Sequence, residues 1–249
     1  MVKERSNRLS DIRILKDNKH GIIVWDINKD FSTHKGSIKK EELKKTSGKV
    51  KTNKGYEFTI IQPTLADLYD VITRKPQIIL QKDIGAIIAY TGINKDSIVV
   101  EAGTGTGASA IILSNIVKKV YSYEKRPDHF EIAKKNVELF DAKNVILKLK
   151  DITEGIDEKD VDLVLLDLPE PWRVVEYAYK ALKPNHFLVA YLPNITQVQE
   201  FVKKVKEFNF EYSVKVFYEQ NWYVKDRVVR PINREYLSFT AFLIFARKL

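Results

Sequence analysis

The sequence predicts an α/β fold: a mostly parallel sheet wound on both faces by helices, with a small β domain before it and an antiparallel hairpin at one sheet edge. Three observations support this prediction. Short β-branched or aromatic runs alternate with amphipathic stretches from about residue 66 onward, which is typical of βαβ units. Residues 1–65 show strand-like runs without a helical period of useful length. The last forty residues contain two strand-like runs and no helix.

The N-terminal 65 residues are interpreted as one small β domain, followed by a larger domain over residues 66–249. "GIIVWDI" (21–27) has the composition of a strand. "VKTNKGYEFTII" (50–61) predicts a hairpin around an Asn-Lys-Gly turn. "FSTHKGSI" (31–38) has the chemistry of a turn.

The larger domain is predicted to contain five parallel strands separated by four helices. The strands are "SIVVEA" (97–102), "KVYSYE" (119–124), "VILKLK" (145–150), "DLVLLDL" (162–168) and "HFLVAYL" (186–192). The helices are "GASAIILSNIVKK", "RPDHFEIAKKNVELF", "WRVVEYAYKALK" and "NITQVQEFVKKVKEF". Pro127 and Asn194 are suitable helix-start residues, and Pro184 is expected to end the third helix. "FEYSVKVFYE" and "SFTAFLIFARKL" would form the closing hairpin.

Composition excludes several classes of protein. The chain has 249 residues and no cysteine, which excludes a disulfide framework, a cysteine zinc site and a cysteine nucleophile. The start has no secretory apolar region, and no run approaches a membrane span of about 18 residues. We therefore expect a cytoplasmic protein without membrane contact or metal. The net charge of +9 fits either a solvated lysine-rich surface or a polyanionic partner.

A glycine-rich turn follows the first strand of the larger domain. In "EAGTGTGA" (101–108), Gly103 and Gly105 would let the backbone approach a ligand, and Gly107 would let the next helix pack close to the strand. Thr104, Thr106 and Ala108 belong to the same predicted cofactor-binding turn. No GxxxxGK[ST] motif is present, so a Walker-type phosphate cradle is disfavoured.

Three acids decide between the cofactors that such a turn serves. Glu101 would repel a pyrophosphate and attract the ammonium group of S-adenosylmethionine (SAM), which carries no phosphate. Glu124 ends the next strand, where a carboxylate accepts ribose hydroxyls, and Asp151 follows the third strand, within reach of an adenine amine. Because the ends of successive parallel strands share one sheet edge, the three acids favour SAM over a nicotinamide dinucleotide.

The fourth strand runs into "DLPEPW" (167–172). Prolines 169 and 171 stiffen this exit and hold the carbonyl groups of Asp167 and Leu168 outward. An acid, fixed carbonyls and the nearby Trp172 suit a planar base that bears an amine. The alternative is a proline-punctuated loop that starts a helix at Trp172, with Asp167 as a strand-end acid.

Taken together and in order, these motifs resemble the TrmI-like tRNA (adenine-N1)-methyltransferases that act on the T loop. The matching stretches cover nearly the whole chain: Thr33-His34-Lys35-Gly36, Gln77, Lys82-Asp83, "EAGTGTG", "YSYEKRPDH", "LLDLPEPW", and "VVRPINREYLSFTAFLIFARKL" with Arg230-Pro231 and Thr240. Two places depart from the family pattern. Leu80-Gln81 replaces an aromatic or histidine followed by proline, and Ser238-Phe239 replaces Gly-His.

The resemblance implies the Rossmann-like fold of class I SAM-dependent methyltransferases and methyl transfer to N1 of adenosine 58, in some archaeal members also 57. It implies a homotetramer, cofactor contacts at Gln77 and Lys125, and substrate contacts at Leu168, Pro169 and Trp172. N1 already has a lone pair, so Asp167 would act by accepting the N6 amine and offsetting the positive charge of the product. The target base would have to be flipped out of the T loop.

Residues 221–236 form the candidate RNA-facing segment. They combine aromatic and basic side chains, namely Trp222, Tyr223, Lys225, Arg227, Arg230 and Arg234. The alternative is an edge loop buried in an oligomer interface. Two other functions also stay open: a methyltransferase for a protein or small molecule, and a catalytically silent RNA-binding subunit.

Overall fold

The computed structural model of the chain describes residues 9–17, 20–72, 78–232 and 239–249. The chain divides into two compact units. Unit 1 comprises residues 1–74 together with 135–142, and unit 2 comprises residues 75–134 and 143–249. That residues 1–65 form a domain of their own stays a prediction. Gln77, Arg234 and Ser238 lie outside the described residues.

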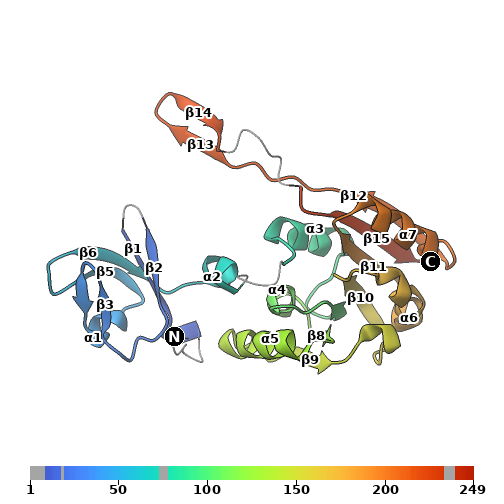
Figure 1. Ribbon diagram of the computed structural model, residues 1–249, viewed down its shortest axis with the longest axis horizontal. Coiled ribbons are helices and arrows are strands. Elements are labelled where there is room, and N and C mark those ends of the chain that lie inside the picture. Colours follow the sequence, from blue (N-terminus) through green and yellow to red (C-terminus); the bar gives the residue numbers. More distant parts are fainter. Residues whose placement is uncertain (1–8, 18–19, 73–77, 233–238) are drawn as a thin grey trace. The chain divides into compact units, whose positions relative to one another are not determined.

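Unit 1 contains a four-stranded antiparallel sheet (Figure 1). Its strands, in spatial order, are β2 (Gly21–Val24), β1 (Arg13–Lys16), β6 (Glu57–Ile61) and β5 (Ser47–Lys51). Leu15, Phe58 and Ile60 are buried in its core. Strands β5 and β6 pair with Lys51 opposite Glu57, so the hairpin predicted around residues 53–55 is confirmed.

The segment expected only as a turn forms a second, shorter hairpin from β3 (Phe31–Thr33) and β4 (Gly36–Ile38). The Thr33 hydroxyl accepts the Lys35 N–H at 3.0 Å and donates to the Gly36 carbonyl at 3.0 Å. These two bonds close the turn, and three-residue strands are too short to be recognised by alternation. Unit 1 also contains the 3₁₀ turn η1 (Leu9–Asp11) and helices α1 (Lys40–Leu43) and α2 (Leu65–Ile72).

Unit 2 contains a seven-stranded sheet. Its spatial order is β12 (Phe210–Lys215), β15 (Phe242–Lys248), β11 (Leu182–Leu192), β10 (Val161–Leu166), β7 (Ile98–Ala102), β8 (Lys119–Glu124) and β9 (Val145–Leu149). The five strands from β11 to β9 run parallel, as predicted. Strand β15 is antiparallel to both β11 and β12 and lies between them. The predicted hairpin therefore forms this edge of the sheet, with β12 as the outermost strand and β15 paired to β11.

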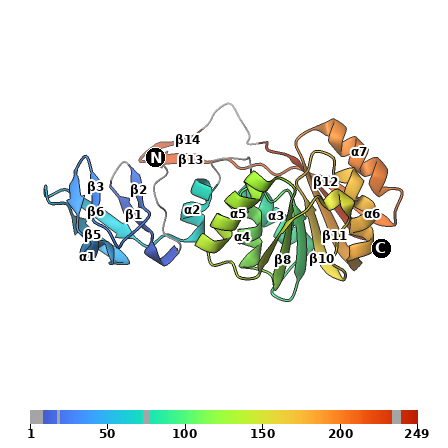
Figure 2. The same cartoon turned by 60° about the horizontal axis from the view of Figure 1, so that its bottom comes forward.

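Helices cover both faces of this sheet (Figure 2). They are α3 (Gln81–Thr91), α4 (Ala108–Ser114), α5 (Pro127–Leu139), α6 (Val175–Ala181) and α7 (Ile195–Val205). Helices α3 and α4 lie on one face, and α6 and α7 on the other. The latter two cover the core around Val164, Leu188 and Phe201.

The helix boundaries follow the sequence with one correction. Helix α5 begins at Pro127, and Asn194 immediately precedes α7. The third helix ends at Ala181, earlier than the predicted stop at Pro184. Pro184 lies inside β11, where the ladder to β10 is irregular between Leu182 and Phe187. A proline is accommodated there because it interrupts no ladder hydrogen bond.

A separate two-stranded hairpin, which we call the arm, lies between β12 and β15 in the sequence (Figure 1). Its strands are β13 (Trp222–Lys225) and β14 (Val228–Pro231), and nearly every residue of both is exposed. None of the described helices is long and apolar enough to span a membrane. No group of three or more His, Asp or Glu side chains among the described residues is placed to hold a metal ion.

Candidate active site

The glycine-rich turn joins β7 to α4. The Gly103 N–H donates to the Tyr123 carbonyl at 3.1 Å, and the Gly107 N–H donates to the Thr104 carbonyl at 2.7 Å. Gly103, Gly105 and Gly107 have φ of +89°, +56° and +81°, a region that side chains disfavour. The turn therefore depends on all three glycines.

Two of these glycines also make room for the chain itself. A Cβ at Gly103 would lie 2.1 Å from the Asp167 carbonyl oxygen, so this glycine lets the end of β10 lie against the turn. A Cβ at Gly107 would lie 3.4 Å from the Ala133 Cβ. Gly107 thus allows the start of α4 to pack close to α5. The sequence analysis predicted instead that this glycine lets α4 pack close to the preceding strand.

A cavity of about 510 Å³ opens at the carboxyl ends of the parallel strands. This is the edge at which open α/β sheets bind ligands. Its lining comes from five segments and comprises Ala102, Gly103, Gly105, Tyr123, Glu124, Lys125, Arg126, His129, Lys150, Asp151, Ile152, Thr153, Asp167, Leu168, Pro169, Glu170, Arg173, Pro193 and Gln197.

The Glu124 carboxylate is fixed by backbone donors at the end of β8. One oxygen accepts the Gly105 N–H at 2.9 Å, and the other accepts the Arg126 N–H at 3.0 Å. The Gly105 amide, which a dinucleotide enzyme would offer to pyrophosphate, is therefore engaged by a carboxylate. This arrangement favours a ligand with hydroxyls and positive charge over one with phosphates.

Asp151 follows β9 and remains charged. It accepts the Thr153 N–H at 2.9 Å and the Thr153 hydroxyl at 2.8 Å. The pKa of Asp151 is lowered by the Thr153 backbone donor, and further by the Thr153 hydroxyl and the Lys125 ammonium. These contacts hold Asp151, Ile152 and Thr153 at the cavity wall as the 3₁₀ turn η2 (Ile152–Glu154) begins.

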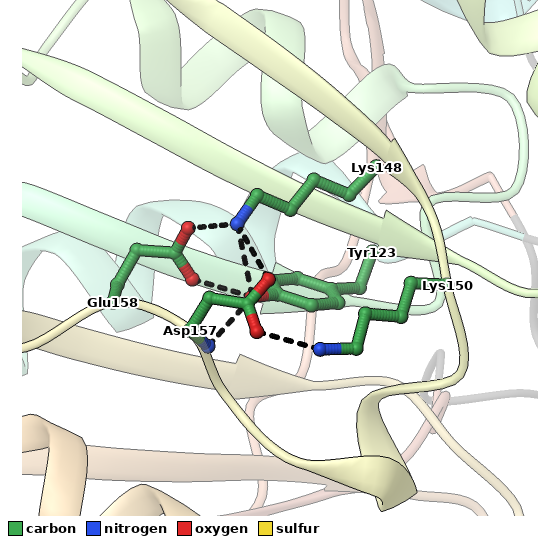
Figure 3. A network of polar contacts seen from close by, with 5 residues as sticks. All are labelled: Tyr123, Lys148, Lys150, Asp157 and Glu158. Carbon is green, nitrogen blue, oxygen red and sulfur yellow. Dashed lines mark hydrogen bonds and ion pairs between the residues drawn. The ribbon is translucent and has the colours of Figure 1, made fainter.

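A partly buried polar network holds the loop that follows this turn (Figure 3). The Tyr123 hydroxyl donates to Glu158 at 2.5 Å and accepts the Asp157 N–H at 3.0 Å. The Lys148 ammonium binds both Glu158 and Asp157, and Lys150 binds Asp157 at 2.6 Å. Strands β8 and β9 are thus tied to residues 157–158, just beyond the cavity wall.

Glu101 lies behind the turn and not on the cavity wall. Its side chain accepts hydrogen bonds from the Ser122 and Ser109 hydroxyls, each at 2.7 Å, and the residue is only 2% exposed. Burial raises the pKa of Glu101 to about 7, against the lowering effect of the two serines. Its position makes it a neighbour of the Asp167 carboxylate, whose pKa it helps to raise.

Asp167 follows β10, and its N–H donates to the Ala102 carbonyl at 2.9 Å. Its carboxylate lines the cavity, and none of the described residues donates a hydrogen bond to it. Burial raises the pKa of Asp167 to about 7, and the Glu101 carboxylate contributes. A half-buried acid without an internal partner is suited to receive a donor from a ligand.

The structure thus brings together eight of the predicted site residues at the cavity: Gly103, Gly105, Glu124, Lys125, Asp151, Asp167, Leu168 and Pro169. Thr104, Thr106, Gly107 and Ala108 belong to the turn but do not line the cavity. Trp172 packs against the core within the 3₁₀ turn η3 (Pro171–Val174). Trp222, Arg227 and Arg230 lie on the arm.

Several residues that line the cavity were not predicted from the sequence. Pro193 follows the end of β11, so the strand-end argument applied to the fifth strand would have found it. Gln197 and Arg173 come from α7 and η3, and no sequence signal marks them. Tyr191, the next-to-last residue of β11, is buried, does not line the cavity and was not predicted either. Burial raises its pKa to about 12, with further contributions from the nearby Asp83 and Asp167 carboxylates.

Fold and cavity together define a SAM-dependent methyltransferase, and two solved structures of methyltransferases are similar to the chain. A SAM-dependent O-methyltransferase from Thermotoga maritima superposes with a TM-score of 0.87 at 29% identity, covering 97% of this chain and 94% of that one. The tRNA (m1A58) methyltransferase TrmI from Aquifex aeolicus has the same fold, with a TM-score of 0.81 at 24% identity over 99% of both chains.

The particular family follows from sequence. Residues 56–235 match the family described as the tRNA methyltransferase complex GCD14 subunit, and the chain belongs to it. The tRNA (adenine(57)-N(1)/adenine(58)-N(1))-methyltransferase TrmI of Methanocaldococcus jannaschii is 37% identical, with 87% of each chain covered. The tRNA (adenine(58)-N(1))-methyltransferase TrmI of Thermus thermophilus is also 37% identical, with 88% of each covered.

Proposed function

We propose that this chain transfers a methyl group from SAM to N1 of a T-loop adenosine in tRNA, at position 58. The observation that carries the proposal is the Asp167 carboxylate, which lies on the cavity wall without a hydrogen-bond donor among the described residues. The family relationship and the two relatives named as adenine-N1 methyltransferases support the same reaction.

The residues of the cavity fit SAM. Glu124 and Asp151 line the cavity, where Glu124 would accept ribose hydroxyls and Asp151 would accept an adenine amine. When bound, SAM supplies an electrophilic methyl group on a positively charged sulfur. The nearby carboxylates of Asp167 and Glu101 favour positive charge in this region. Lys125 and Gln77 stay predicted cofactor contacts.

Asp167 would carry the chemistry without acting as a base. Adenine N1 already has a lone pair, so no proton has to be removed before the methyl group is transferred. The carboxylate would accept the N6 amine, which orients N1, and its charge would offset the positive charge that N1 acquires. Leu168 and Pro169 at the same rim would contact the base. Because Trp172 packs against the core, its predicted stacking role has less support.

We further propose that the chain binds tRNA through basic surface that includes Arg227 and Arg230, that it assembles as a homotetramer, and that it acts in the cytoplasm. Cations at the cavity rim, namely Lys125, Arg126, Lys150 and Arg173, suit a phosphate backbone. Eukaryotic relatives, such as that of Dictyostelium discoideum, are named as catalytic subunits, which fits activity within an assembly.

The decisive experiment treats an unmodified tRNA transcript with the protein and SAM and locates the added methyl group by mass analysis of nuclease fragments. We expect methylation at adenosine 58, lost in a transcript that carries guanosine there. A matched transcript changed at position 57 reports whether the neighbouring adenosine is also modified. SAM binding without any methylated tRNA would favour the protein or small-molecule alternative, and failure to bind SAM would favour a silent subunit.

A further inference from the structure

The arm has two chemically different faces. Strands β13 and β14 pair with Tyr223 opposite Arg230 and Val224 opposite Val229. Residues opposite each other in an antiparallel pair share a face, and successive residues alternate between faces. Trp222, Val224 and Val229 therefore lie on an apolar face, whereas Tyr223, Lys225 and Arg230 lie on the other, together with Val228 opposite Lys225.

The second face combines a ring with cations. The Arg230 guanidinium lies 5.5 Å from the centroid of the Tyr223 ring, and the Tyr223 side chain remains 40% exposed. Lys225 and Arg230 are exposed as well. Exposed rings on which bases stack, next to cations that meet phosphates, are the chemistry with which proteins hold RNA backbones and unpaired bases.

The root of the arm is held by one buried ion pair. The Lys82 ammonium donates to Asp83 at 2.7 Å, to the Phe217 carbonyl at 2.9 Å and to the Thr240 hydroxyl at 2.7 Å. Thr240 in turn donates to the other Asp83 oxygen at 2.7 Å. Phe217 precedes the arm and Thr240 follows it, so Lys82 and Asp83 at the start of α3 join the outgoing and returning chain.

This root clamp of Lys82, Asp83 and Thr240 lies close to the cavity. The Tyr191 hydroxyl is 3.5 Å from Asp83, and Tyr191 is near enough to Asp167 for the two to interact electrostatically. Asp83 is fully buried, and its two carboxylate oxygens contact Lys82 and Thr240. The clamp at the base of the arm is therefore connected to the proposed catalytic carboxylate of Asp167 through Asp83 and Tyr191.

We propose that the Tyr223–Lys225–Arg230 face of the arm contacts tRNA outside the base pocket, and that Lys82, Asp83 and Thr240 are positioning residues that fix the root of this contact beside the pocket. This inference rests on the proposed function. It also removes Trp222 from the expected RNA contact, because Trp222 lies on the opposite, apolar face of the arm.

The first test compares the two faces. In steady-state methylation of tRNA, Arg230→Ala and Tyr223→Ala should each raise KM for tRNA about tenfold, the size of effect found for a lost stacking or ionic contact. The dissociation constant of SAM should stay within about twofold of wild type. Val224→Ser, on the apolar face, is the matched control and should leave KM unchanged.

The second test addresses the clamp. Thr240→Val removes the hydroxyl and keeps the shape, whereas Thr240→Ser keeps the hydroxyl. We expect Thr240→Val to raise KM for tRNA several-fold and to speed hydrogen exchange in residues 219–232, with SAM affinity unchanged. Thr240→Ser should restore both values. Lys82→Met is a harsher variant, since it leaves the buried Asp83 carboxylate without its cation.

The outcomes separate this inference from the proposed function. If wild type methylates no tRNA adenosine, the proposed function fails, and the arm contact that rests on it is overturned with it. If wild type is active and Tyr223→Ala and Arg230→Ala keep the wild-type KM, the arm contact alone is overturned. A rise in KM for Val224→Ser equal to that for Arg230→Ala would assign the effect to the apolar face. A Thr240→Ser variant as poor as Thr240→Val would overturn the clamp.

Discussion

At the scale of single residues, the reaction depends most on the charge of Asp167. Asp167→Ala should lower single-turnover methyl transfer about 100-fold or more, the usual loss when one well-placed electrostatic group is removed, while SAM affinity changes little. Asp167→Asn keeps the size and one acceptor but loses the charge. If charge dominates, the asparagine variant should be nearly as slow as the alanine variant, and near wild-type rates for both would remove Asp167 from catalysis.

Gly103 determines where Asp167 lies. A methyl group there would meet the Asp167 carbonyl at 2.1 Å, and the residue has φ of +89°, so Gly103→Ala should displace the end of β10. We expect turnover to fall at least about tenfold and the protein to lose roughly 1–3 kcal/mol of stability. Gly85→Ala in α3 is the control. A Cβ there meets nothing within 4 Å, so stability should hold or rise.

Buried carboxyls give the free protein a defined pH dependence. Burial raises the pKa of Asp167 and Glu101 to about 7, whereas the same groups in the unfolded chain titrate near 4. Between these values the folded state binds more protons, so the free energy of unfolding should fall as pH rises from about 4.5 to 7 and then level off.

Methyl transfer should follow the opposite course, because the ionised form of Asp167 is the useful one. The value of kcat/KM, which reports ionisations of the free enzyme, should rise through about pH 7 in wild type and should show no such rise in Asp167→Asn. A wild-type kcat/KM that stays constant between pH 6 and 8 would contradict an ionisation of Asp167 in that range.

At the scale of elements, the loop between η2 and β10 depends on the network of Figure 3. Tyr123→Phe or Glu158→Gln should loosen residues 157–158 and with them the wall that carries Asp151 and Ile152. We expect SAM to bind about three- to tenfold more weakly, the effect of one or two lost hydrogen bonds, with a smaller change in the rate at saturating SAM. Calorimetric titration of SAM measures this affinity.

Tyr121→Phe is the matched control for this network. Tyr121 lies two residues earlier on β8, where its ring also faces the Lys148 ammonium at 5.4 Å, but its hydroxyl is not part of the network. Its SAM affinity should equal that of wild type. If Tyr121→Phe and Tyr123→Phe weaken SAM binding equally, the Tyr123 hydroxyl has no specific role in SAM binding.

The sequence was most informative where burial dictates residue type. Strand β10 is buried along its whole length, and such strands read as continuous apolar runs such as "DLVLLDL". Of the three acids predicted to meet at one sheet edge, Glu124 and Asp151 line the cavity, whereas Glu101 lies behind the turn. The β3–β4 hairpin was too short for a periodic signal. The engagement of Glu101 by Ser109 and Ser122 could not be predicted, because those serines come from α4 and β8 and meet it only through packing.

At the scale of the whole molecule, charge predicts how the two ligands should respond to salt. The chain carries 42 lysines and arginines against 33 aspartates and glutamates. Because tRNA binding releases condensed counterions, its affinity should fall steeply as salt rises from about 50 to 200 mM, whereas SAM affinity should hardly move. Filter binding for tRNA and calorimetry for SAM give the two slopes, and parallel slopes would argue against a separate polyanion surface.

The position of β15 has a consequence for how the protein is made. Strand β15 is hydrogen-bonded on one side to β11 and on the other to β12, although it is the last strand in the sequence. During synthesis on the ribosome, β12 therefore emerges before the strand that joins it to the sheet. The nascent sheet is complete only after residues 242–248 have left the exit tunnel, and a premature stop codon before them would remove the partner of β12 and expose β11 as an edge.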